Sequence, residues 1–402
     1  MRKIVTVLLI LGFLIASSTA TLLLVKSEPK TIVVPDDYPT IRDAITAASA
    51  GDTIYVKNGV YNESFIIDKP LSLIGQDRQN TIITWSVGII HQFTPPPTVQ
   101  VQANDVTISG FNFKNCYGGV RIKSEINSYT SAVLNCKIIG NNFEDNPIAI
   151  SAYAGLSLVP HIAVASNLII AQNNINGNGV GISIGQSAVT ISGNTIQNNN
   201  EGVFIQSAEN VTVFENNISK NKDGLVLYNP GPYYIIGNTI NDNSGSGIDF
   251  SYYCNRCTIA SNSIANNGVG VKLENVSSYI GVDNFVINNN FVNNQFQVQT
   301  GVVTDKVIWA FKGSGNYWSD YASKYPSASA TSGGTWDIPY MIDSNNTDAY
   351  PLVSPILIST PSGSQDTFAY VIYAVIVIVV LLAIINVALI WRLRRTKTQK
   401  AN

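Results

Sequence analysis

The sequence predicts an all-β fold in which short parallel strands wind into a stack of coils. A segment of about 22 residues recurs along the middle of the chain, for example "ISGNTIQNNNEGVFI" from Ile191 and "YIIGNTINDNSGSGIDF" from Tyr234. Within each copy, apolar and polar residues alternate over a few positions and are then interrupted by Asn or Gly. This pattern is typical of strands and is too short for helices. A regular period of this length indicates a repeat architecture, with one coil per copy.

One Asn anchors every copy of the repeat. The anchors are Asn141, Asn173, Asn194, Asn216, Asn238, Asn262 and Asn289, separated by 32, 21, 22, 22, 24 and 27 residues. An apolar residue stands three positions before and two positions after each anchor, and a second Asn stands five positions after it. Stacked coils place like residues about 4.8 Å apart, so these amides are expected to hydrogen-bond along the stack. We also expect the anchored Asn residues to adopt the left-handed backbone of the corners.

The chain divides into seven segments, each with its own composition. They are a signal peptide or signal anchor (1–25), an N-terminal cap with the first coils (31–99), the repeat coils (100–300), a closing segment (301–355), a linker (356–367), a transmembrane helix (368–391) and a basic cytoplasmic tail (392–402).

Both membrane-directed segments are recognised by their flanks. Met1, Arg2 and Lys3 precede a long apolar run, and whether that run is cleaved stays open. The 24-residue apolar stretch at 368–391 is long enough to span a bilayer, and the basic residues after it favour a cytoplasmic C-terminus. The coils are therefore predicted to face outward from a single-pass protein, or from a two-pass protein if the N-terminal segment is retained.

Composition restricts the partners. The chain is 45% apolar and 12% charged with a net charge of −2, so no basic surface for nucleic acid is expected. An external location agrees with candidate glycosylation sites at Asn62, Asn210, Asn217, Asn275 and Asn345. The candidate disulfides are Cys116–Cys136 and Cys254–Cys257. For the second pair, two buried thiols are the alternative, and both options are favoured over a metal site.

Two carboxylates form the candidate catalytic pair. Glu201 and Asp223 each stand seven positions after their anchors, so they should lie one above the other in adjacent coils. At that spacing they could share a proton, or act as nucleophile and acid of a retaining glycosidase. The alternative, which the sequence favours, is a pair of solvated corner residues. Asp249 and Lys272 share another outward column and are interpreted as a surface ion pair.

Tyrosines form the candidate ligand-binding surface. Exposed rings offer flat apolar faces that suit sugar rings. The residues are Tyr228, Tyr233 and Tyr234 in one corner and Tyr252 and Tyr253 in the next. A second aromatic group, at 317–340, is interpreted as a cover for the open end of the stack.

The two ends of the stack resemble a known family. The stretch "TIVVPDDYPTIRDAITAASAGDTIYVKNGVYNESFIIDKPLSLIGQD" (31–77) resembles the N-terminal cap of NosD-like right-handed parallel β-helix proteins, in which a short helix, Thr40 to Ala48 here, plugs the end of the coil. The segment "GSGNYWSDY…WDIPYMIDSNNTDAYPLVSP" (313–355) is similar to the closing segment of that family. The resemblance implies a right-handed parallel β-helix with a pectate-lyase-like fold shared by carbohydrate-binding and sugar-hydrolysing modules, and we expect about eleven coils. It also implies a membrane-anchored surface protein of archaeal type.

The chain departs from that family in its metal chemistry. Family members often carry an Asp- and Gly-rich stretch that looks like a calcium loop, where this chain has "ASKYPSASATSGGTWD" with one Asp. Name-giving members are linked to copper delivery, and copper prefers His, Cys or Met ligands. His91, His161, Met341 and the cysteines form no cluster in the sequence. No metal and no cofactor are therefore expected.

These patterns favour one function among three. The leading hypothesis is non-catalytic binding of a polysaccharide or another cell-envelope glycan at the cell surface. The alternative is a polysaccharide lyase or glycoside hydrolase that uses Glu201 and Asp223. Copper handling comes third.

Overall fold

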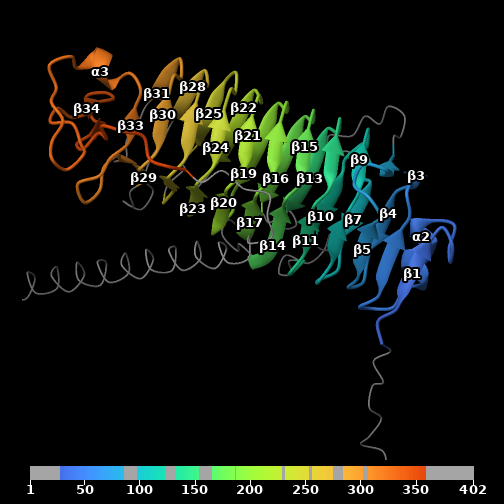
Figure 1. The fold of residues 1–402 in the computed structure, drawn as a ribbon. Helices are drawn as coiled ribbons and strands as arrows, with labels where there is room; N and C mark the ends of the chain where they lie inside the picture. Colours follow the sequence, from blue (N-terminus) through green and yellow to red (C-terminus); the bar gives the residue numbers. More distant parts are fainter. Residues whose placement is uncertain are drawn as a thin grey trace, which may run out of the picture. The chain divides into compact units, whose positions relative to one another are not determined.

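The computed structural model describes residues 28–85, 97–123, 133–153, 165–185, 187–228, 231–252, 256–274, 284–301 and 307–358. All of them belong to the first of two compact units, Met1–Ser359. Over these ranges the chain winds into a right-handed parallel β-solenoid (Figure 1), which confirms the predicted fold class of the coils. The two predicted membrane-directed segments lie outside the described residues, among which no helix is long and apolar enough to cross a membrane.

Three parallel sheets form the walls of the solenoid, and each repeat coil contributes a strand to sheet A, then to sheet B, then to sheet C. In spatial order, the described part of sheet A contains β1 (Thr31–Val34), β2 (Thr53–Val56), β5 (Ser72–Gly75), β8 (Thr107–Ser109), β11 (Lys137–Ile139), β14 (Ala165–Ala171), β17 (Ser187–Ser192), β20 (Val211–Phe214), β23 (Tyr233–Ile236), β26 (Thr258–Ala260), β29 (Asn284–Ile287) and β32 (Val307–Ile308). The described part of sheet B contains β3 (Gly59–Asn62), β6 (Thr81–Thr84), β9 (Asn112–Lys114), β12 (Asn142–Glu144), β15 (Asn174–Asn176), β18 (Thr195–Gln197), β21 (Asn217–Ser219), β24 (Thr239–Asn241), β27 (Ser263–Ala265), β30 (Asn290–Val292) and β33 (Tyr317–Trp318). The described part of sheet C contains β4 (Phe65–Ile67), β7 (Val99–Val101), β10 (Val120–Ile122), β13 (Ile148–Tyr153), β16 (Val180–Gly185), β19 (Glu201–Gln206), β22 (Asp223–Tyr228), β25 (Ser246–Tyr252), β28 (Val269–Leu273) and β31 (Phe296–Thr300).

The core is a set of apolar columns inside the coil. Ile191 of sheet A, Ile196 of sheet B and Val203 of sheet C are all fully buried and belong to the same coil. Like residues stack in register, as in the pairing of Ile191 with Val213 on the next coil. The apolar positions three before and two after each anchor therefore point inward.

The anchored Asn residues form a continuous buried hydrogen-bond ladder. The Oδ1 atom of Asn216 accepts bonds from both the backbone N–H and the Nδ2 group of Asn194, each at 2.9 Å. The Nδ2 group of Asn216 donates to Asn238 Oδ1 at 3.0 Å and to Ile191 O at 2.9 Å. The same pattern repeats at the second Asn of each coil, where Asn199 donates to Asn221. Each amide thus connects three successive coils, as the sequence predicted.

The expectation for the backbone of these Asn residues was wrong. The residue with positive φ at each of these corners is the one immediately before the ladder Asn. Before the first ladder these include Gly193 (φ 60°), Glu215 (φ 53°) and Gly237 (φ 67°), and before the second they include Asn198 (φ 57°) and Lys220 (φ 58°). The preceding residue makes the turn, so the ladder Asn keeps a side chain that points into the corner. Sequence reasoning placed the two roles on one residue.

A column of glycines follows the second ladder because successive coils approach closely there. A Cβ atom on Gly202 would lie 2.5 Å from Gly224 O, and one on Gly224 would lie 2.5 Å from Gly247 O. Real Cβ contacts are never that short, so a larger residue would have to displace backbone of the next coil. This explains the Gly that follows the second Asn in most copies of the repeat.

The first candidate disulfide does not form. Cys116 and Cys136 are both buried free thiols. Cys116 precedes the second ladder, since its N–H donates to Asn146 Oδ1, whereas Cys136 lies before sheet A, with its Sγ 3.5 Å from Ala103 O. The two residues occupy different corners, which the sequence spacing did not reveal. Burial raises the pKa of both thiols, to about 11 for Cys136. Cys254 of the other candidate pair lies outside the described residues.

The helix α2 (Ile41–Ala47) closes the N-terminal end, close to the predicted Thr40 to Ala48. Thr40 is the N-cap, and its side chain accepts a hydrogen bond from the N–H of Asp43. The Glu63 carboxylate accepts the N–H groups of Ile41 and Arg42, each at 3.0 Å, and so fixes the first turn against the coil. The buried face of α2 lies against β1, β2 and β4.

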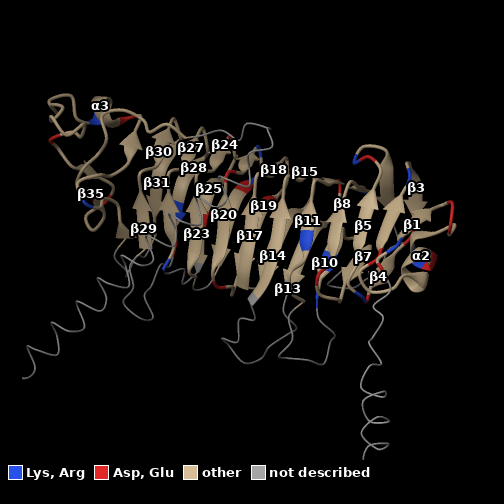
Figure 2. Cartoon of the chain, turned by 60° about the horizontal axis from the view of Figure 1, so that its bottom comes forward, with Lys and Arg blue, Asp and Glu red and all other residues tan. Residues whose placement is uncertain are grey.

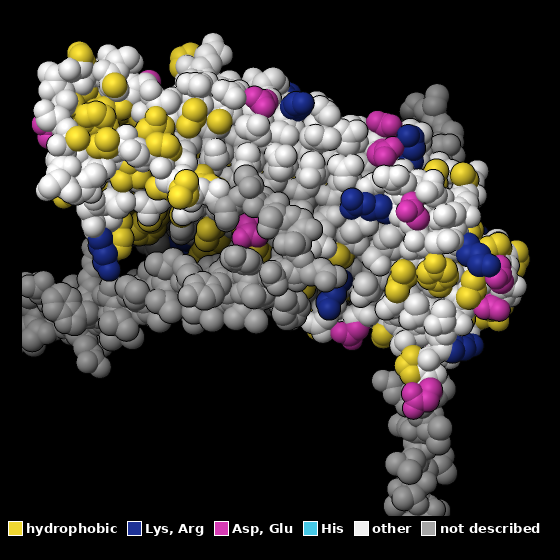
Figure 3. Space-filling model, in the orientation of Figure 1, with side chains coloured by type: hydrophobic (Ala, Val, Ile, Leu, Met, Phe, Trp, Pro, Cys, Tyr) yellow, Lys and Arg dark blue, Asp and Glu magenta, His cyan; other side chains and the backbone are white. Residues whose placement is uncertain are grey.

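The C-terminal end is closed by aromatic rings, as predicted for that group. The Phe291 ring stacks on the Trp318 ring with 4.4 Å between their centroids, and the Trp318 ring stacks on the Tyr340 ring with 4.1 Å between their centroids. The closing segment also contains α3 (Tyr321–Lys324) and the antiparallel pair β34 (Tyr340–Met341) and β35 (Thr347–Asp348). Asn316 adds one further rung to the first ladder, whose last acceptor is the buried carboxylate of Asp348, at 2.7 Å from Asn316 N. In Figure 3, hydrophobic side chains gather at the two ends of the solenoid.

Candidate functional site

The outer face of sheet C carries the candidate site. Side chains alternate between the two faces of a strand, so the neighbours of the buried core residues point outward. The register aligns one outward residue per coil into a column that runs along the solenoid: Gln100, Arg121, Ser151, Ser183, Phe204, Val226, Asp249, Lys272 and Gln299. Figure 2 shows that charged residues are sparse along the strands. The charges in this column are therefore exceptions that need an explanation.

An acid–base cluster lies on β25 and β28. Lys272 Nζ is 3.4 Å from Asp249 Oδ2 and 3.1 Å from Glu274 Oε1. Asp249 is only 8% exposed although it points away from the core, and its Oδ1 atom is buried without a hydrogen-bond partner. Burial raises the pKa of Asp249, and this shift is opposed by the charge of Lys272 and by hydrogen bonds from the side chains of Ser251 and Lys272. An unsatisfied buried acceptor of this kind is costly unless a ligand or water satisfies it.

An aromatic pair lies next to this cluster on the same face. The rings of Phe204 and Tyr228 are 6.4 Å apart with a 38° tilt, and both side chains are half-buried. Val226, on the same strand as Tyr228, is the register partner of both Phe204 and Asp249. One coil, about 4.8 Å, therefore separates the tyrosine strand from the Asp249 strand.

The predicted catalytic carboxylates are stacked as expected. Glu201 and Asp223 are register partners on β19 and β22. Burial raises the pKa of Glu201, and the charge of Asp223 adds to this effect. Asp223 Oδ1 accepts the N–H of Ser246 at 2.9 Å, so this carboxylate serves the turn of the next coil. The catalytic role of the pair stays a prediction, and Asp223 also has a structural role as the acceptor for the Ser246 N–H.

The predicted tyrosine surface does not form as one patch. Tyr233 is fully buried in the core column of sheet A, so its assignment as a ligand-binding residue was wrong. Tyr234 points outward from sheet A, between Thr212 and Thr258. Of the three tyrosines predicted in the first corner, Tyr228 is the one that lies in sheet C, at the end of β22. The side chain of Tyr252 and all of Tyr253 lie outside the described residues. Tyr233 and Tyr234 are consecutive residues of β23, so their side chains point to opposite faces of the strand, and the corner between β22 and β23 separates Tyr228 from both.

The glycosylation candidates divide into two groups. Asn62, Asn210, Asn217 and Asn345 are exposed, and Asn275 lies outside the described residues. Their modification stays a prediction.

Metal ligands are not clustered in the described part of the chain, where no group of three or more His, Cys, Asp or Glu could hold an ion. His91 and His161 lie outside it.

Sequence reasoning missed Phe204 and underestimated Asp249 and Lys272. The alternation around Val203 and Ile205 placed Phe204 on the outer face, which was the available signal. That it faces Tyr228 depends on the register, which sequence spacing alone does not fix when coils differ in length.

The fold and this outer face define a parallel β-solenoid with an aromatic and charged stripe along one wall. The family model described as periplasmic copper-binding protein (NosD) matches residues 127–323, just under half of the chain. No curated protein matches the sequence.

Among solved structures, the similarity to one viral protein supports the fold, and two weaker similarities are reported beside it. The Dettilon tailspike protein (gp208) is 15% identical with a TM-score of 0.51, over 67% of this chain and 57% of that one. ORF18 of Geobacillus virus E2 is 14% identical with a TM-score of 0.46, over 65% and 56%. The A-module of the mannuronan C-5 epimerase AlgE4 of Azotobacter vinelandii is 16% identical with a TM-score of 0.43, over 67% and 93%. The chain thus spans somewhat more than half the length of the two viral proteins. The similarity to the tailspike protein concerns the fold and not the activity.

Proposed function

We propose that this protein is a membrane-anchored, cell-surface β-solenoid that binds a polysaccharide or another envelope glycan along the outer face of sheet C without cleaving it. One observation carries the proposal. The Phe204–Tyr228 ring pair and the Asp249–Lys272–Glu274 cluster follow one another along the solenoid axis on a single face. A linear polymer lying along the axis meets both in succession.

Each group in this stripe has a defined part in sugar recognition. Aromatic rings pack against the apolar faces of sugar rings while hydroxyl groups stay available for hydrogen bonds. The exposed Glu274 carboxylate supplies an acceptor for a hydroxyl. Lys272 supplies an ammonium group that suits a uronate or another anionic substituent.

Binding is favoured over cleavage because of how the charges are arranged. Asp249 and Glu274 both contact Lys272, so each carboxylate is held in an ion pair and is not free as a nucleophile. The second candidate function is a polysaccharide lyase or glycoside hydrolase. It is supported by the pKa of Asp249, which burial raises and which therefore favours the proton-donating form of this carboxyl.

A polysaccharide panel distinguishes these two functions. Purified full-length protein in detergent is incubated with immobilised acidic and neutral polysaccharides. We expect retention on at least one polysaccharide, with no new reducing ends and no unsaturated uronate absorbance. Product that forms with the native protein and disappears in Asp249→Asn would establish the enzyme instead. Absence of both retention and product would contradict glycan recognition altogether.

The membrane anchor is part of the proposal and rests on the sequence of residues 368–391. We expect alkaline carbonate to leave the full chain in the membrane pellet and to release a chain that ends at Ile358. Retention of both chains would place the anchor in residues 1–25. Release of both would contradict a membrane-anchored protein.

A further inference from the structure

Sheet C ends one strand earlier than its two neighbours at the C-terminal end. After β31, sheets A and B continue into β32 and β33, whereas the described part of sheet C has no further strand. The chain leaves β33 through Ser319 and Asp320 and enters the short helix α3 where the next strand of sheet C would begin. The outer edge of β31 therefore has no paired strand among the described residues.

The free edge of β31 presents backbone groups at alternate residues. Leu273 O points toward the following coil, since it accepts the N–H of Gly301 at 2.7 Å. Thr300 is the register partner of Leu273, so its backbone carbonyl points away from β28 in the same way, while its side chain bonds the Asp343 carboxylate of the closing segment. In a parallel ladder the orientation repeats every second residue, so the backbone groups of Val298 face the open side as well.

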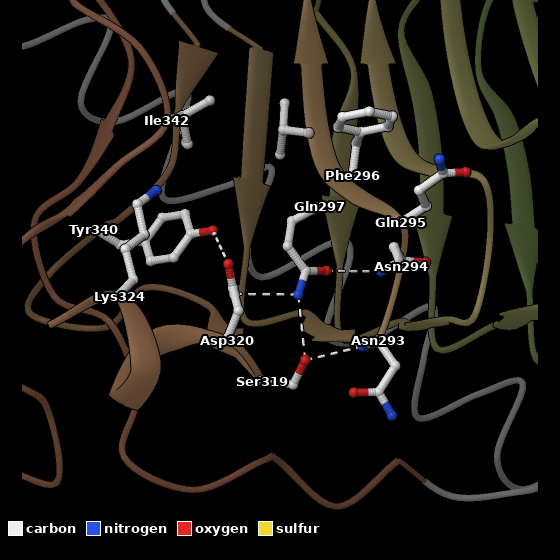
Figure 4. A pocket seen from close by; sticks show the side chains of 11 residues that line it. Asn293, Asn294, Gln295, Phe296, Gln297, Ser319, Asp320, Lys324, Tyr340 and Ile342 are labelled. Atoms are coloured by element: carbon white, nitrogen blue, oxygen red, sulfur yellow. Dashed lines mark hydrogen bonds between the residues drawn. The ribbon is translucent and has the colours of Figure 1, made fainter. Parts of the chain in front are cut away.

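A cavity of about 360 Å³ lies on this edge (Figure 4). Phe296, Gln297 and Val298 form its β31 side. On the far side, the closing segment contributes Lys324, Tyr340 and Ile342. The Phe296 ring is 55% exposed, and Val298 and Ile342 are only partly buried. The cavity thus combines an open strand edge with apolar walls.

The polar floor of the cavity is already organised. Asn294 Nδ2, at the end of the second ladder, donates to Gln297 Oε1 at 2.9 Å. Gln297 Nε2 donates to Asp320 Oδ1 at 3.1 Å, and the Tyr340 hydroxyl donates to Asp320 Oδ2 at 2.9 Å. Lys324 Nζ lies 4.0 Å from the centre of the Tyr340 ring and donates to Met341 O. The Asp320 carboxylate keeps acceptor capacity toward the cavity.

We propose that an extended segment of a partner protein binds here as an added strand, parallel to β31. Its backbone pairs with Val298 and Thr300, and apolar side chains at alternate positions contact Phe296 and the space between Val298 and Ile342. A Lys or Arg next to the first apolar residue meets Asp320. Such strand addition takes its affinity from main-chain hydrogen bonds and its specificity from pockets for alternate side chains. This inference does not depend on glycan binding at the outer face of sheet C.

An extended peptide fits this edge better than a sugar does. The groups that remain open on β31 are backbone groups spaced at strand geometry, and a peptide strand satisfies them in register. The exposed Phe296 ring and the partly buried Val298 and Ile342 suit apolar side chains on both sides of such a strand. Unpaired edges of this kind are also the sites at which strands from other chains add.

The test uses a random heptapeptide display library selected against the full-length protein in detergent, followed by Kd measurements on synthetic peptides. We expect enriched peptides with apolar residues at alternate positions. Val298→Pro removes an N–H that faces the open side and not β28, a position at which edge strands tolerate Pro. It should weaken peptide binding at least tenfold. Phe296→Ala, which truncates an exposed ring, should weaken binding about fivefold and serves if Val298→Pro fails to fold.

Matched controls distinguish strand addition from nonspecific peptide binding. Val292→Ala, on sheet B, should leave peptide affinity unchanged. N-methylation of the peptide at the nitrogens that face β31 should abolish binding, whereas N-methylation at the intervening residues should not. Failure to enrich any peptide, or enriched peptides that are insensitive to both cavity variants, would overturn the proposal. Binding of an oligosaccharide that Phe296→Ala abolishes would overturn it in favour of a sugar subsite.

Discussion

Asn216→Ala is expected to lower the free energy of unfolding by about 4 kcal/mol, because each buried hydrogen-bonding group left unsatisfied costs roughly 1–3 kcal/mol. The substitution removes the acceptor for the backbone N–H and Nδ2 group of Asn194, and it removes donors to Ile191 O and Asn238 Oδ1. Chemical denaturation of the purified protein, followed by circular dichroism, measures the change.

Asn217→Ala is the matched control. Asn217 adjoins Asn216 in the chain but is exposed on sheet B, so its replacement should change the unfolding free energy by no more than about 0.5 kcal/mol. Equal effects of the two substitutions would show that the ladder contributes little to stability. Solenoids unfold in segments when one interface is weakened, so the Asn216 variant should also broaden the transition.

Asp348→Ala is expected to lower the free energy of unfolding by about 3 kcal/mol at pH 7, because it leaves buried N–H donors at the end of the first ladder without an acceptor. The Asp348 carboxylate accepts Asn316 N at 2.7 Å, Trp318 Nε1 at 2.9 Å and Tyr350 N at 3.0 Å. Asp348→Asn keeps the shape and one acceptor oxygen and should cost less than half as much. Thermal unfolding of both variants measures the two losses.

The pH dependence of the Asp348 effect has a defined sign. Burial raises the pKa of Asp348 above its ordinary value, against the hydrogen bonds that lower it. The folded state therefore holds this proton more tightly than the unfolded state. The resulting stabilisation is fully present below the unfolded pKa and is lost as the pH rises through the folded pKa. The stability of the native protein relative to Asp348→Asn should grow as the pH falls from 7 to 4, and a constant difference would contradict the raised pKa.

Much of the solenoid could be predicted because its repeat is a direct consequence of stacking. A column such as Asn194–Asn216–Asn238 leaves a signature at fixed spacing, and the alternation around it identifies the core. The end of the first ladder was missed because Asp348 reaches it from 32 residues beyond Asn316, outside the repeat. A contact between a repeat residue and a residue beyond the repeats leaves no periodic pattern in the sequence.

The candidate site was harder to predict because residues that are adjacent in the sequence point to different faces of a strand, while residues one coil apart share a face. Tyr233 and Tyr234 are neighbours in sequence, yet one is buried in the core and the other points outward from sheet A. Phe204 and Tyr228 are 24 residues apart and lie on one face, because a coil brings them together. Which side chains lie beside one another on a face depends on the register. The register is set by backbone pairing and by the residue with positive φ at each corner.

The most direct measurement is the Kd of Tyr228→Ala, beside that of Tyr234→Ala, for whichever polysaccharide retains the native protein. Both residues are half-buried tyrosines close to the end of a strand, but Tyr228 belongs to sheet C and Tyr234 points outward from sheet A. Glycan binding on the outer face of sheet C predicts that Tyr228→Ala weakens affinity about tenfold, which is roughly 1.4 kcal/mol, while Tyr234→Ala leaves it unchanged. Unchanged affinity in Tyr228→Ala, or an equal loss in both variants, would contradict binding at that face.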